Sequence, residues 1–452
     1  MTQSTNGKLQ PAVSTTKSER SLARARHCIA GGDNSTMRVL PYHLPLVAAR
    51  GQGSRVWDVD GHEYIDLNMA YGPLIFGHRP QPVIDAVVRQ LTESGSQLGF
   101  PAEVSARVAE KVIRLYPHIE MLRFSSTGSE AIAAALRLAR TVTGRRYIIA
   151  FEGHYHGSSD GIFHRYHAPV ESLPKGLYGP AIPGTLGMNG APHDVLVCRW
   201  NSPEALEQCL SDHQDQVAAV IMEPVMGNSG TIPPQPGYLE IARSLAHEFG
   251  ALLVFDEVIT GMRVASGGAQ ERYAVEADIT VLSKALGGGF PISAVGSTRD
   301  IMQCIVDGQL FHGGVYSGNT LVMSAADAVL DEIHRNRTGT YRHLEEVSTE
   351  FAQGVDEIFT RLGIPHHVHQ VGPIISMFLT HNDCGPIMSY RDARQACDVE
   401  KYIALQHQLQ HNGVYFHPNQ FEPMFFSTAH THQDVAVALE RIEDGARSAL
   451  LI

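Results

Sequence analysis

The sequence predicts an α/β protein with a large domain, built on a mainly parallel sheet covered by helices, and a smaller α+β domain made from both ends of the chain. Two observations predict this class. Apolar runs of strand length alternate with amphipathic helical segments through the middle of the chain, which is the rhythm of strand, crossover helix and next strand. These runs are continuously apolar rather than alternating, which is typical of strands buried on both faces.

The chain begins with residues 1–18, which are rich in Ser, Thr, Gln and Lys and are expected to be a flexible tail. Residues 19–80 are expected to form the N-terminal part of the small domain. They contain a helical pattern from about Ser18 to Ala30 and then two short extended runs in VWDVDGHEYIDL. The Asp60-Gly61 pair between these runs predicts a β-hairpin.

Residues 81–325 are expected to form the large domain, and residues 326–452 the C-terminal part of the small domain. The large domain alternates helical segments with the strand-like runs MLRF, YIIAF, VLVCRW, AAVIMEP, ALLVFDEV and ITVLSK. Residues 166–194 interrupt this rhythm with Pro and Gly. An irregular segment of this length inside a compact domain predicts a lid or a binding loop.

Composition limits the classes of function. The chain of 452 residues has a formal net charge of −12, which argues against a nucleic-acid-binding surface. No apolar run approaches the roughly 18–20 residues of a membrane helix and the N-terminus is polar, so we expect a cytoplasmic protein without a membrane partner. The six cysteines lack CxxC spacing, which argues against a zinc knuckle and against a disulfide framework.

Ligands of doubly wound sheets bind at the carboxyl ends of the strands, and four strand ends carry reactive residues. The run MLRF leads into Ser125 to Glu130 and then directly into a helix. Hydroxyls and free N–H groups at a helix N-terminus form an anion site that fits a phosphate. The simpler alternative is that Thr127 or Ser126 only caps the helix.

Two further strand ends carry a lysine and an acid. Lys284 follows the run ITVLS and stands before Gly287 to Gly289, so a dry environment could lower its pKa and make it a nucleophile. The alternative is an exposed lysine in a loose loop. Asp256 follows ALLVF and could hold a protonated ring nitrogen, a metal or only a helix N-terminus.

The fourth strand end is EGHYHG, after YIIAF. His154 and His156 could ligate a metal, but no acidic or cysteine partner has suitable spacing, so stacking by Tyr155 is favoured and no metal is expected. Together the four ends offer a phosphate cradle, an acid for a ring nitrogen, an aromatic ring for stacking and an amine for a Schiff base. Pyridoxal 5′-phosphate requires these groups.

The sequence also resembles a known family. The segments VWDVDGHEYIDL, GPLIFGH, IEMLRFSSTGSEA, FEGHYHG, MEPVMGNSG, LLVFDEVITGMR, LSKALGGGFPISAVG and GGVYSGNT are similar, in order and spacing, to those of the class III aminotransferases of fold type I. Residues 34–38 (NSTMR) and the late segment QFE with AHT resemble the glutamate-1-semialdehyde aminomutase subgroup most closely. The resemblance extends from about residue 25 to the C-terminus and implies a seven-stranded type of large sheet.

The resemblance assigns roles to individual residues. It implies that Lys284 forms the Schiff base with the cofactor, that Asp256 pairs with the pyridinium nitrogen and that Glu223 lies near the ring hydroxyl. The other implied cofactor contacts are Thr127, Gly128, Ser129, Tyr155, His156, Val258 and Ser317. The implied substrate contacts are Arg38 for a carboxylate, Tyr71, Asn228 and Glu422.

Three departures from the family pattern bear on the reaction. Val315 stands where the family usually has a Thr that reaches the phosphate of the partner subunit, so either Ser317 or water replaces that Thr or the phosphate is held a little less strongly. Where the family usually has Asn-Ser-Gly-Thr-Glu, this chain has Ser-Thr-Gly-Ser-Glu at residues 126–130, which keeps the hydroxyl donors but loses the asparagine amide. The gating loop of the aminomutases is replaced by HRYHAPVESLPKGLYGPAIPGTLGMNG.

The changed gating loop leads us to expect an aminotransferase that moves an amino group between a small-molecule donor and a carbonyl acceptor. The alternative is a true glutamate-1-semialdehyde 2,1-aminomutase that makes 5-aminolevulinate. The joint presence of Lys284, Asp256 and Arg38 argues against a non-catalytic binding protein. The resemblance also implies a C2 homodimer in which the segment from Val315 to Asn319 contributes to the partner's site.

Overall fold

A computed structural model describes residues 15–188, 193–382 and 384–450. Its largest sheet has eight strands in the order β4-β11-β10-β9-β8-β5-β7-β6. The bounds are β4 Met121–Ser125, β5 Tyr147–Phe151, β6 Tyr178–Pro180, β7 Val195–Cys198, β8 Val217–Met222, β9 Leu252–Glu257, β10 Ile279–Leu282 and β11 Ser293–Ser297. Strands β7, β5, β8, β9 and β10 pair in parallel, whereas β11 is antiparallel to both β4 and β10. The predicted mainly parallel sheet is therefore confirmed.

The eighth strand, β6, comes from the segment 166–194 that the sequence predicted to be a lid or binding loop. Residues Tyr178–Pro180 pair antiparallel with β7 at the edge of the sheet. Three residues that end in a proline carry no periodic pattern, and an edge strand tolerates proline because one side of it makes no ladder bonds. Part of the expected loop is therefore sheet.

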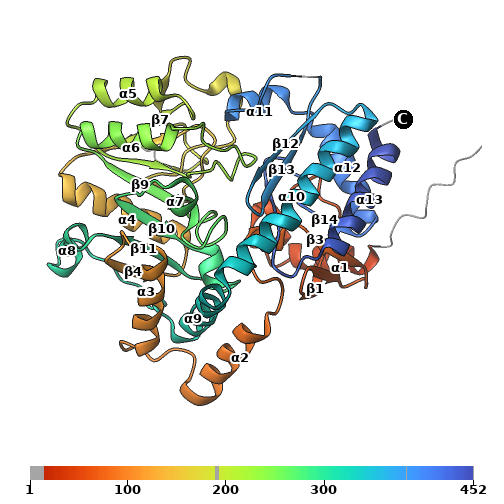
Figure 1. Ribbon diagram of the computed structural model, residues 1–452, viewed down its shortest axis with the longest axis horizontal. Coiled ribbons are helices and arrows are strands. Elements are labelled where there is room, and N and C mark those ends of the chain that lie inside the picture. The colour runs from red at the N-terminus through yellow and green to blue at the C-terminus, as the bar shows by residue number, and fades with distance from the viewer. Residues whose placement is uncertain (1–14, 189–192, 383, 451–452) are drawn as a thin grey trace, which may run out of the picture.

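Helices cover both faces of this sheet (Figure 1). One face packs α4 (Gly128–Thr143) and α8 (Arg299–Val306), and the other packs α5 (Pro203–Asp212) and α6 (Tyr238–Glu248). Consecutive strand residues enter opposite cores: Ile148 belongs to the α4 side and Ile149 to the α6 side. Because both side-chain directions are buried, the central strands are apolar along most of their length, and polar residues such as Asp256 lie toward their carboxyl ends.

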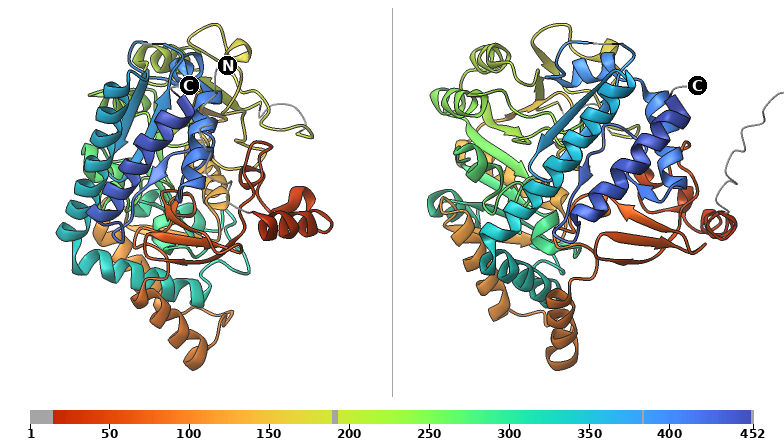
Figure 2. Two further views of the ribbon diagram at one scale, coloured as in Figure 1. Left: turned by 90° about the vertical axis from the view of Figure 1, so that its right-hand side faces the viewer. Right: turned by 45° about the vertical axis from the view of Figure 1, so that its right-hand side comes forward.

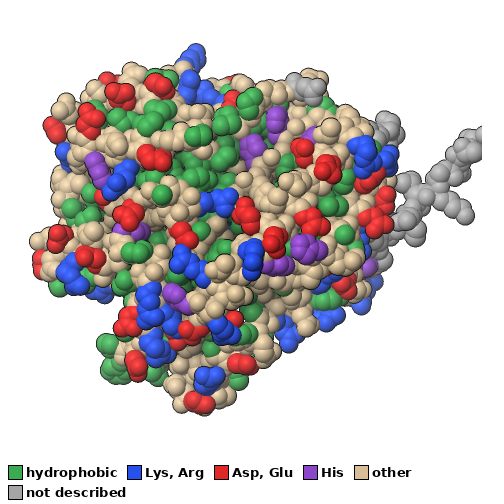
Figure 3. Space-filling view, in the orientation of Figure 1, with side chains coloured by type: hydrophobic (Ala, Val, Ile, Leu, Met, Phe, Trp, Pro, Cys, Tyr) green, Lys and Arg blue, Asp and Glu red, His purple; other side chains and the backbone are tan. Residues whose placement is uncertain are grey.

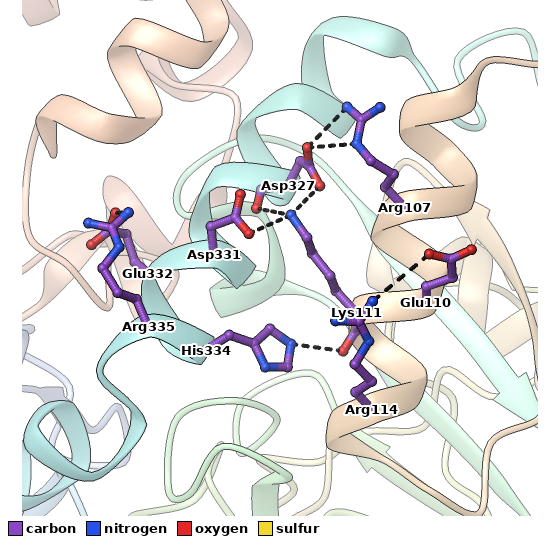
Figure 4. Close-up of polar contacts among 9 residues, drawn as sticks. All are labelled: Arg107, Glu110, Lys111, Arg114, Asp327, Asp331, Glu332, His334 and Arg335. Atoms are coloured by element: carbon purple, nitrogen blue, oxygen red, sulfur yellow. Dashed lines mark hydrogen bonds and ion pairs between the residues drawn. The ribbon is translucent and has the colours of Figure 1, made fainter.

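Three helices extend the large domain below the sheet in Figure 1: α2 (Gln81–Arg89), α3 (Glu103–Leu115) and α9 (Thr320–Arg335). A charged cluster joins α3 to α9 (Figure 4). Lys111 Nζ lies 2.6 Å from a carboxylate oxygen of Asp327 and 2.6 Å from one of Asp331, and Arg107 also contacts Asp327. On the face drawn in Figure 3, acidic and basic side chains are interspersed.

Both ends of the chain build the remaining part of the molecule. One sheet has the order β1-β2-β3-β14 and a second has the order β12-β13-β15. Their bounds are β1 Ala48–Gln52, β2 Arg55–Asp58, β3 Glu63–Asp66, β12 His366–Val371, β13 Ile374–Leu379, β14 Val414–Tyr415 and β15 Met424–Phe425. The antiparallel pair β2 and β3 encloses Asp60-Gly61, which confirms the predicted hairpin. Strand β14 pairs in parallel with β3 and so joins the two ends.

The helices of this part are α1 Thr16–Arg26, α10 Arg337–Leu362, α11 Tyr390–Ala396, α12 Val399–His411 and α13 His432–Leu450. In Figure 2 the C-terminal helices lie beside the N-terminal strands. Residues 1–14 of the expected tail lie outside the described residues, and the tail prediction is wrong for Thr16 to Ser18, which belong to α1. The domain boundaries after residues 80 and 325 stay predictions. Within the described ranges, no helix has the length and apolarity that a membrane span requires.

Candidate active site

Lys284 lies at the carboxyl end of β10, where a short 3-10 turn (Lys284–Gly287) begins. Its φ of +35° is unusual for a residue with a side chain, and such backbone strain is concentrated at functional sites. Burial lowers the pKa of the Lys284 ammonium, and the nearby carboxyl groups of Glu422 and Glu223 oppose this shift. The side chain is therefore not the exposed surface lysine that the sequence left open.

Asp256, in β9 next to β10, is the second predicted site residue. Its carboxylate is 4% exposed, accepts a hydrogen bond from the Val258 N–H at 3.1 Å and lies 2.8 Å from Nδ1 of His156. Because a carboxylate only accepts, Nδ1 of His156 is the donor. Among the described residues, no group of three His, Cys, Asp or Glu side chains is placed to hold a metal ion.

The predicted anion site lies at the N-terminus of α4. Thr127 is the N-cap: its hydroxyl accepts from Glu130 N–H at 3.3 Å, and the Glu130 carboxylate accepts from the N–H groups of Ser126 and Thr127. Helix capping is therefore present. It leaves the N–H groups of Gly128 and Ser129 at the positive end of a four-turn helix, where no helical carbonyl is in reach.

A cavity of about 230 Å³ joins these strand ends. Its walls include Thr127, Gly128, Ser129, Tyr155, Gly157, Glu223, Asn228, Asp256, Val258, Ile259, Ser283 and Lys284. Gly157 leaves no room for a side chain, since its φ is +85° and a Cβ would lie 2.5 Å from Ser129 Oγ, and a Cβ on Gly128 would be tight, at 3.2 Å from Val258. Larger residues would close the cradle.

These walls fit a flat phosphorylated pyridine. One end of the cavity offers N–H groups and hydroxyls for an anion, and Tyr155 and Val258 line the space that leads to Asp256 and Lys284. A buried carboxylate that lines the cavity and holds a histidine behind it is suited to a ring N–H⁺. Thr127, Gly128, Ser129, Tyr155 and Val258 therefore line one cavity together with Asp256 and Lys284.

Glu223 is buried beside this cavity and bonded on both oxygens. It accepts from Tyr155 N–H at 2.8 Å, from Gly227 N–H at 2.9 Å and from the Asn228 amide at 2.9 Å. Burial is the main cause that raises the pKa of its carboxyl to about 7, and Asp256 adds to it. Glu223 thus fixes the backbone of Tyr155 and the loop of Asn228.

A second cavity of about 180 Å³ shares Tyr155, Asn228, Ile259 and Lys284 with the first one. The other residues that line it are Ser35, Met37, Arg38, Tyr71, Tyr166, Glu422, Pro423 and Phe425. All four predicted substrate contacts therefore meet at one place. Burial raises the pKa of the Glu422 carboxyl to about 7. Arg38 is half-exposed, and its guanidinium lies 3.1 Å from the Asp33 carboxylate.

Two predicted cofactor contacts lie elsewhere. His156 lies behind Asp256 and is absent from the cavity wall, so it acts on the site through Asp256. Ser317 lines a separate cavity of about 370 Å³ with Ser125, Ser129 and His312. Val315, beside it, is 79% exposed. Within one chain, Ser317 therefore does not reach the cofactor cavity.

Sequence reasoning missed several walls of the two cavities. The missed residues are Ser35, Ser283, Ile259 and Phe425. Nothing in their own residue types indicated a site. The only signal in the sequence was that each lies close to a predicted site residue, namely Arg38, Lys284, Val258 or Glu422. Tyr166 lies in the segment that the sequence predicted to be a lid or a binding loop. Because that segment has no periodic pattern, the sequence did not show which way the Tyr166 side chain points. Its place in the substrate cavity is a finding of the structure.

Comparison with known proteins agrees with this geometry. The family described as aminotransferase class-III matches residues 37–444. A glutamate-1-semialdehyde 2,1-aminomutase of Desulfitobacterium hafniense (strain Y51) is 39% identical over 436 residues, covering 96% of this chain and 98% of the relative. This similarity favours the aminomutase alternative over the two-substrate aminotransferase that the changed gating loop led us to expect.

Solved structures give the same family. An omega-transaminase from Sphaerobacter thermophilus superposes with a TM-score of 0.87 at 27% identity, covering 97% of this chain and 98% of that one. A transaminase with PLP bound also has a TM-score of 0.87, at 26% identity over 97% and 99% of the two chains. The protein therefore belongs to the class III aminotransferases, fold type I enzymes whose cofactor is pyridoxal 5′-phosphate.

Proposed function

We propose that this protein is a glutamate-1-semialdehyde 2,1-aminomutase, which moves the amino group of its substrate from C2 to C1 and makes 5-aminolevulinate. The observation that carries the proposal is the cavity of about 180 Å³ in which Arg38, Glu422 and Lys284 meet. Glutamate 1-semialdehyde is small and has a carboxylate at one end and an amine and an aldehyde at the other. The similarity to a relative of that name supports the same reading.

When bound, the cofactor takes up an amino group, returns it and delocalises the electrons of a broken C–H bond. The residues of the protein bind the cofactor, orient the substrate and move the proton. Asp256, as a carboxylate, would keep the ring nitrogen protonated, and the helix end at Gly128 and Ser129 would hold the phosphate. Lys284, whose pKa is lowered by burial, would accept a proton from the substrate carbon that bears the amino group and would later return a proton to the substrate.

Glu422 and Arg38 orient the substrate in this proposal. Glu422, with a pKa of about 7, can accept a hydrogen bond from the substrate amine or give a proton to it near neutral pH. Arg38 binds the substrate carboxylate, which would take the place of Asp33. Tyr71 lines the same cavity.

The second candidate is transamination between two separate substrates. It is favoured by the segment that follows His164, whose Tyr166 forms part of the substrate cavity in place of a short Gly- and Ser-rich gating loop. An enzyme with a different wall there would hold a different acceptor. The omega-transaminase that superposes on the chain is consistent with this candidate.

One experiment separates the two candidates. The purified, cofactor-loaded protein is incubated with glutamate 1-semialdehyde alone, and 5-aminolevulinate is quantified. We expect multiple turnovers without any added donor. If product forms only after an amino donor and a separate carbonyl acceptor are supplied, the two-substrate candidate replaces the aminomutase.

We also propose a C2 homodimer. The side chains of Phe100 and Phe311 are 82% and 84% exposed, and Val315 and Tyr316 beside them are also exposed. The Gln97 amide donates to the Val315 carbonyl at 2.7 Å, which joins the two segments. Several large apolar side chains that are exposed close together are typical of a protein–protein interface. Sedimentation equilibrium should give twice the chain mass, and a monomer with full activity would contradict the proposal.

A further inference from the structure

We propose that Tyr166 is a specificity-determining residue that limits the size of the substrate, and that Tyr390 and Arg391 of α11 are positioning residues that hold its segment in place. The segment, residues 166–174, is here called the wall segment. This inference rests on the active site proposed above. It differs from the sequence expectation in that the wall segment is bound to the protein rather than free to swing.

Tyr166 faces the reacting groups. It lines the cavity of about 180 Å³ together with Lys284 and Glu422, and its ring centroid lies 4.8 Å from that of Tyr155. Burial raises the pKa of the Tyr166 phenol, and the Glu422 carboxyl adds to this shift. The phenol is therefore neutral, and its ring occupies space on the side of the cavity that a longer substrate would need.

The next residue ties the wall segment to the cofactor side of the site. Nε2 of His167 donates a hydrogen bond of 2.8 Å to the carbonyl of Asn228, whose side-chain amide binds Glu223. Burial lowers the pKa of His167 to about 4, so the ring is neutral and keeps this bond across the physiological pH range. The ring also lies parallel to that of Tyr390, at 6.3 Å.

Helix α11, from the C-terminal part of the chain, holds the wall segment at two points. The Tyr390 hydroxyl donates to the Ala168 carbonyl at 2.6 Å, and Nη2 of Arg391 donates to the Pro174 carbonyl at 2.6 Å. Arg391 is itself fixed by Glu152, with contacts of 2.8 Å from Nε and 2.7 Å from Nη2. Glu152 directly follows β5 and is 3% exposed.

These hydrogen bonds and the packing of the wall segment hold it in place beside the substrate cavity. Ala168 and Leu173 are buried in the same core as Tyr390, so the segment could swing out only by exposing apolar surface. It would also leave the Tyr390 hydroxyl without the Ala168 carbonyl and the Arg391 guanidinium without the Pro174 carbonyl. Access to Lys284 is therefore limited by Tyr166 before the substrate binds, and small amines are selected over bulky ones.

The first test measures size selection. Cofactor-loaded wild type, Tyr166→Ala and Lys175→Ala, an exposed position just after the wall segment, react in single turnovers with alanine and with 1-phenylethylamine, followed by loss of the cofactor's visible absorption. We expect Tyr166→Ala to raise the ratio of rate constants in favour of the phenyl-bearing amine about tenfold or more. Lys175→Ala should keep the wild-type ratio. A ratio for Tyr166→Ala within about threefold of wild type would overturn the proposal.

The second test measures positioning without relying on turnover. Amide hydrogen exchange of residues 166–174 is compared for the loaded wild type, Arg391→Ala, Arg391→Lys and Gln395→Ala, the last an exposed position on the same helix. We expect exchange to quicken about tenfold or more in Arg391→Ala and by less in Arg391→Lys, which keeps a charge but loses the two-pronged contact. Gln395→Ala should match wild type. Unchanged exchange in both Arg391 variants would overturn the positioning role.

The same variants distinguish this inference from the proposed function. In Arg391→Ala the KM for the amine should rise more than kcat falls, because the residue touches neither cofactor nor substrate. Hydrogen exchange and the amine ratio do not depend on glutamate 1-semialdehyde. If the expected changes occur in a protein that makes no 5-aminolevulinate, only the proposed aminomutase activity fails.

Discussion

His156 and Asp256 form a fully buried pair: Nδ1 of the histidine donates to the aspartate carboxylate across 2.8 Å, and the carboxylate lines the cofactor cavity. The histidine thus fixes the orientation of the carboxylate without touching the cavity. Such a bond to a buried charge contributes about 1.5–3 kcal/mol.

His156→Phe should therefore weaken cofactor binding by about 10- to 100-fold, because Asp256 loses its donor in a dry environment. Equilibrium dialysis of the cofactor measures the change. His247→Phe is the matched control, since His247 forms a similar pair with Asp278 at the surface, at 3.0 Å. Equal affinities of the His156 variant and wild type would refute a role for the pair.

Lys284→Ala should lower turnover by roughly 10³-fold or more, because the variant lacks both the amine that binds the cofactor and the base that moves the proton. It should also lack the visible absorption of lysine-bound cofactor. Spectra and single-turnover rates measure both effects. Lys175→Ala serves as the exposed control, and retained turnover in the Lys284 variant would disprove the assignment.

Glu422 makes the stability of the cofactor-free protein depend on pH. Its carboxyl has a pKa of about 7 in the fold against an ordinary value of 4.5, so between these values the folded state holds a proton that the unfolded chain has lost. The free energy of unfolding therefore falls as pH rises from about 4.5 to 7, by roughly 1–3 kcal/mol.

Glu422→Gln should make this fall smaller. Urea-unfolding midpoints at pH 5 and pH 7.5 measure it, with the exposed Glu400→Gln of α12 as the control. If the Glu422 variant and wild type lose the same stability between the two pH values, the carboxyl does not titrate in this range.

Val315→Thr should tighten cofactor binding about tenfold in the proposed homodimer, because a threonine hydroxyl at this exposed position could reach the phosphate of the partner subunit. Cofactor dissociation rates measure the effect. Val306→Thr, at an exposed position of α8, controls for the added hydroxyl. An unchanged dissociation rate would show that this segment does not reach the phosphate.

Much of the large domain was predictable because its signals are local. Continuous apolar strands, the capped start of α4 and the glycines after Lys284 depend on neighbours in sequence. The neighbouring parallel strands β9 and β10 bring Asp256 and Lys284 together, as expected for residues at carboxyl ends. Strands β6 and β11 were missed because short runs such as Tyr178–Pro180 and Ser293–Ser297 are strands only through their sheet partners.

The amino-acid sequence alone determined the cofactor chemistry, since lysine, aspartate and a hydroxyl-rich helix start are residue types that periodicity places at strand ends. The tertiary structure alone decided what surrounds the substrate. Arg38 and Glu422 come from opposite ends of the chain, and Tyr166 comes from an irregular segment held by α11. Their meeting depends on long-range packing and on hydrogen bonds to backbone carbonyls, and neither leaves a periodic trace in the sequence.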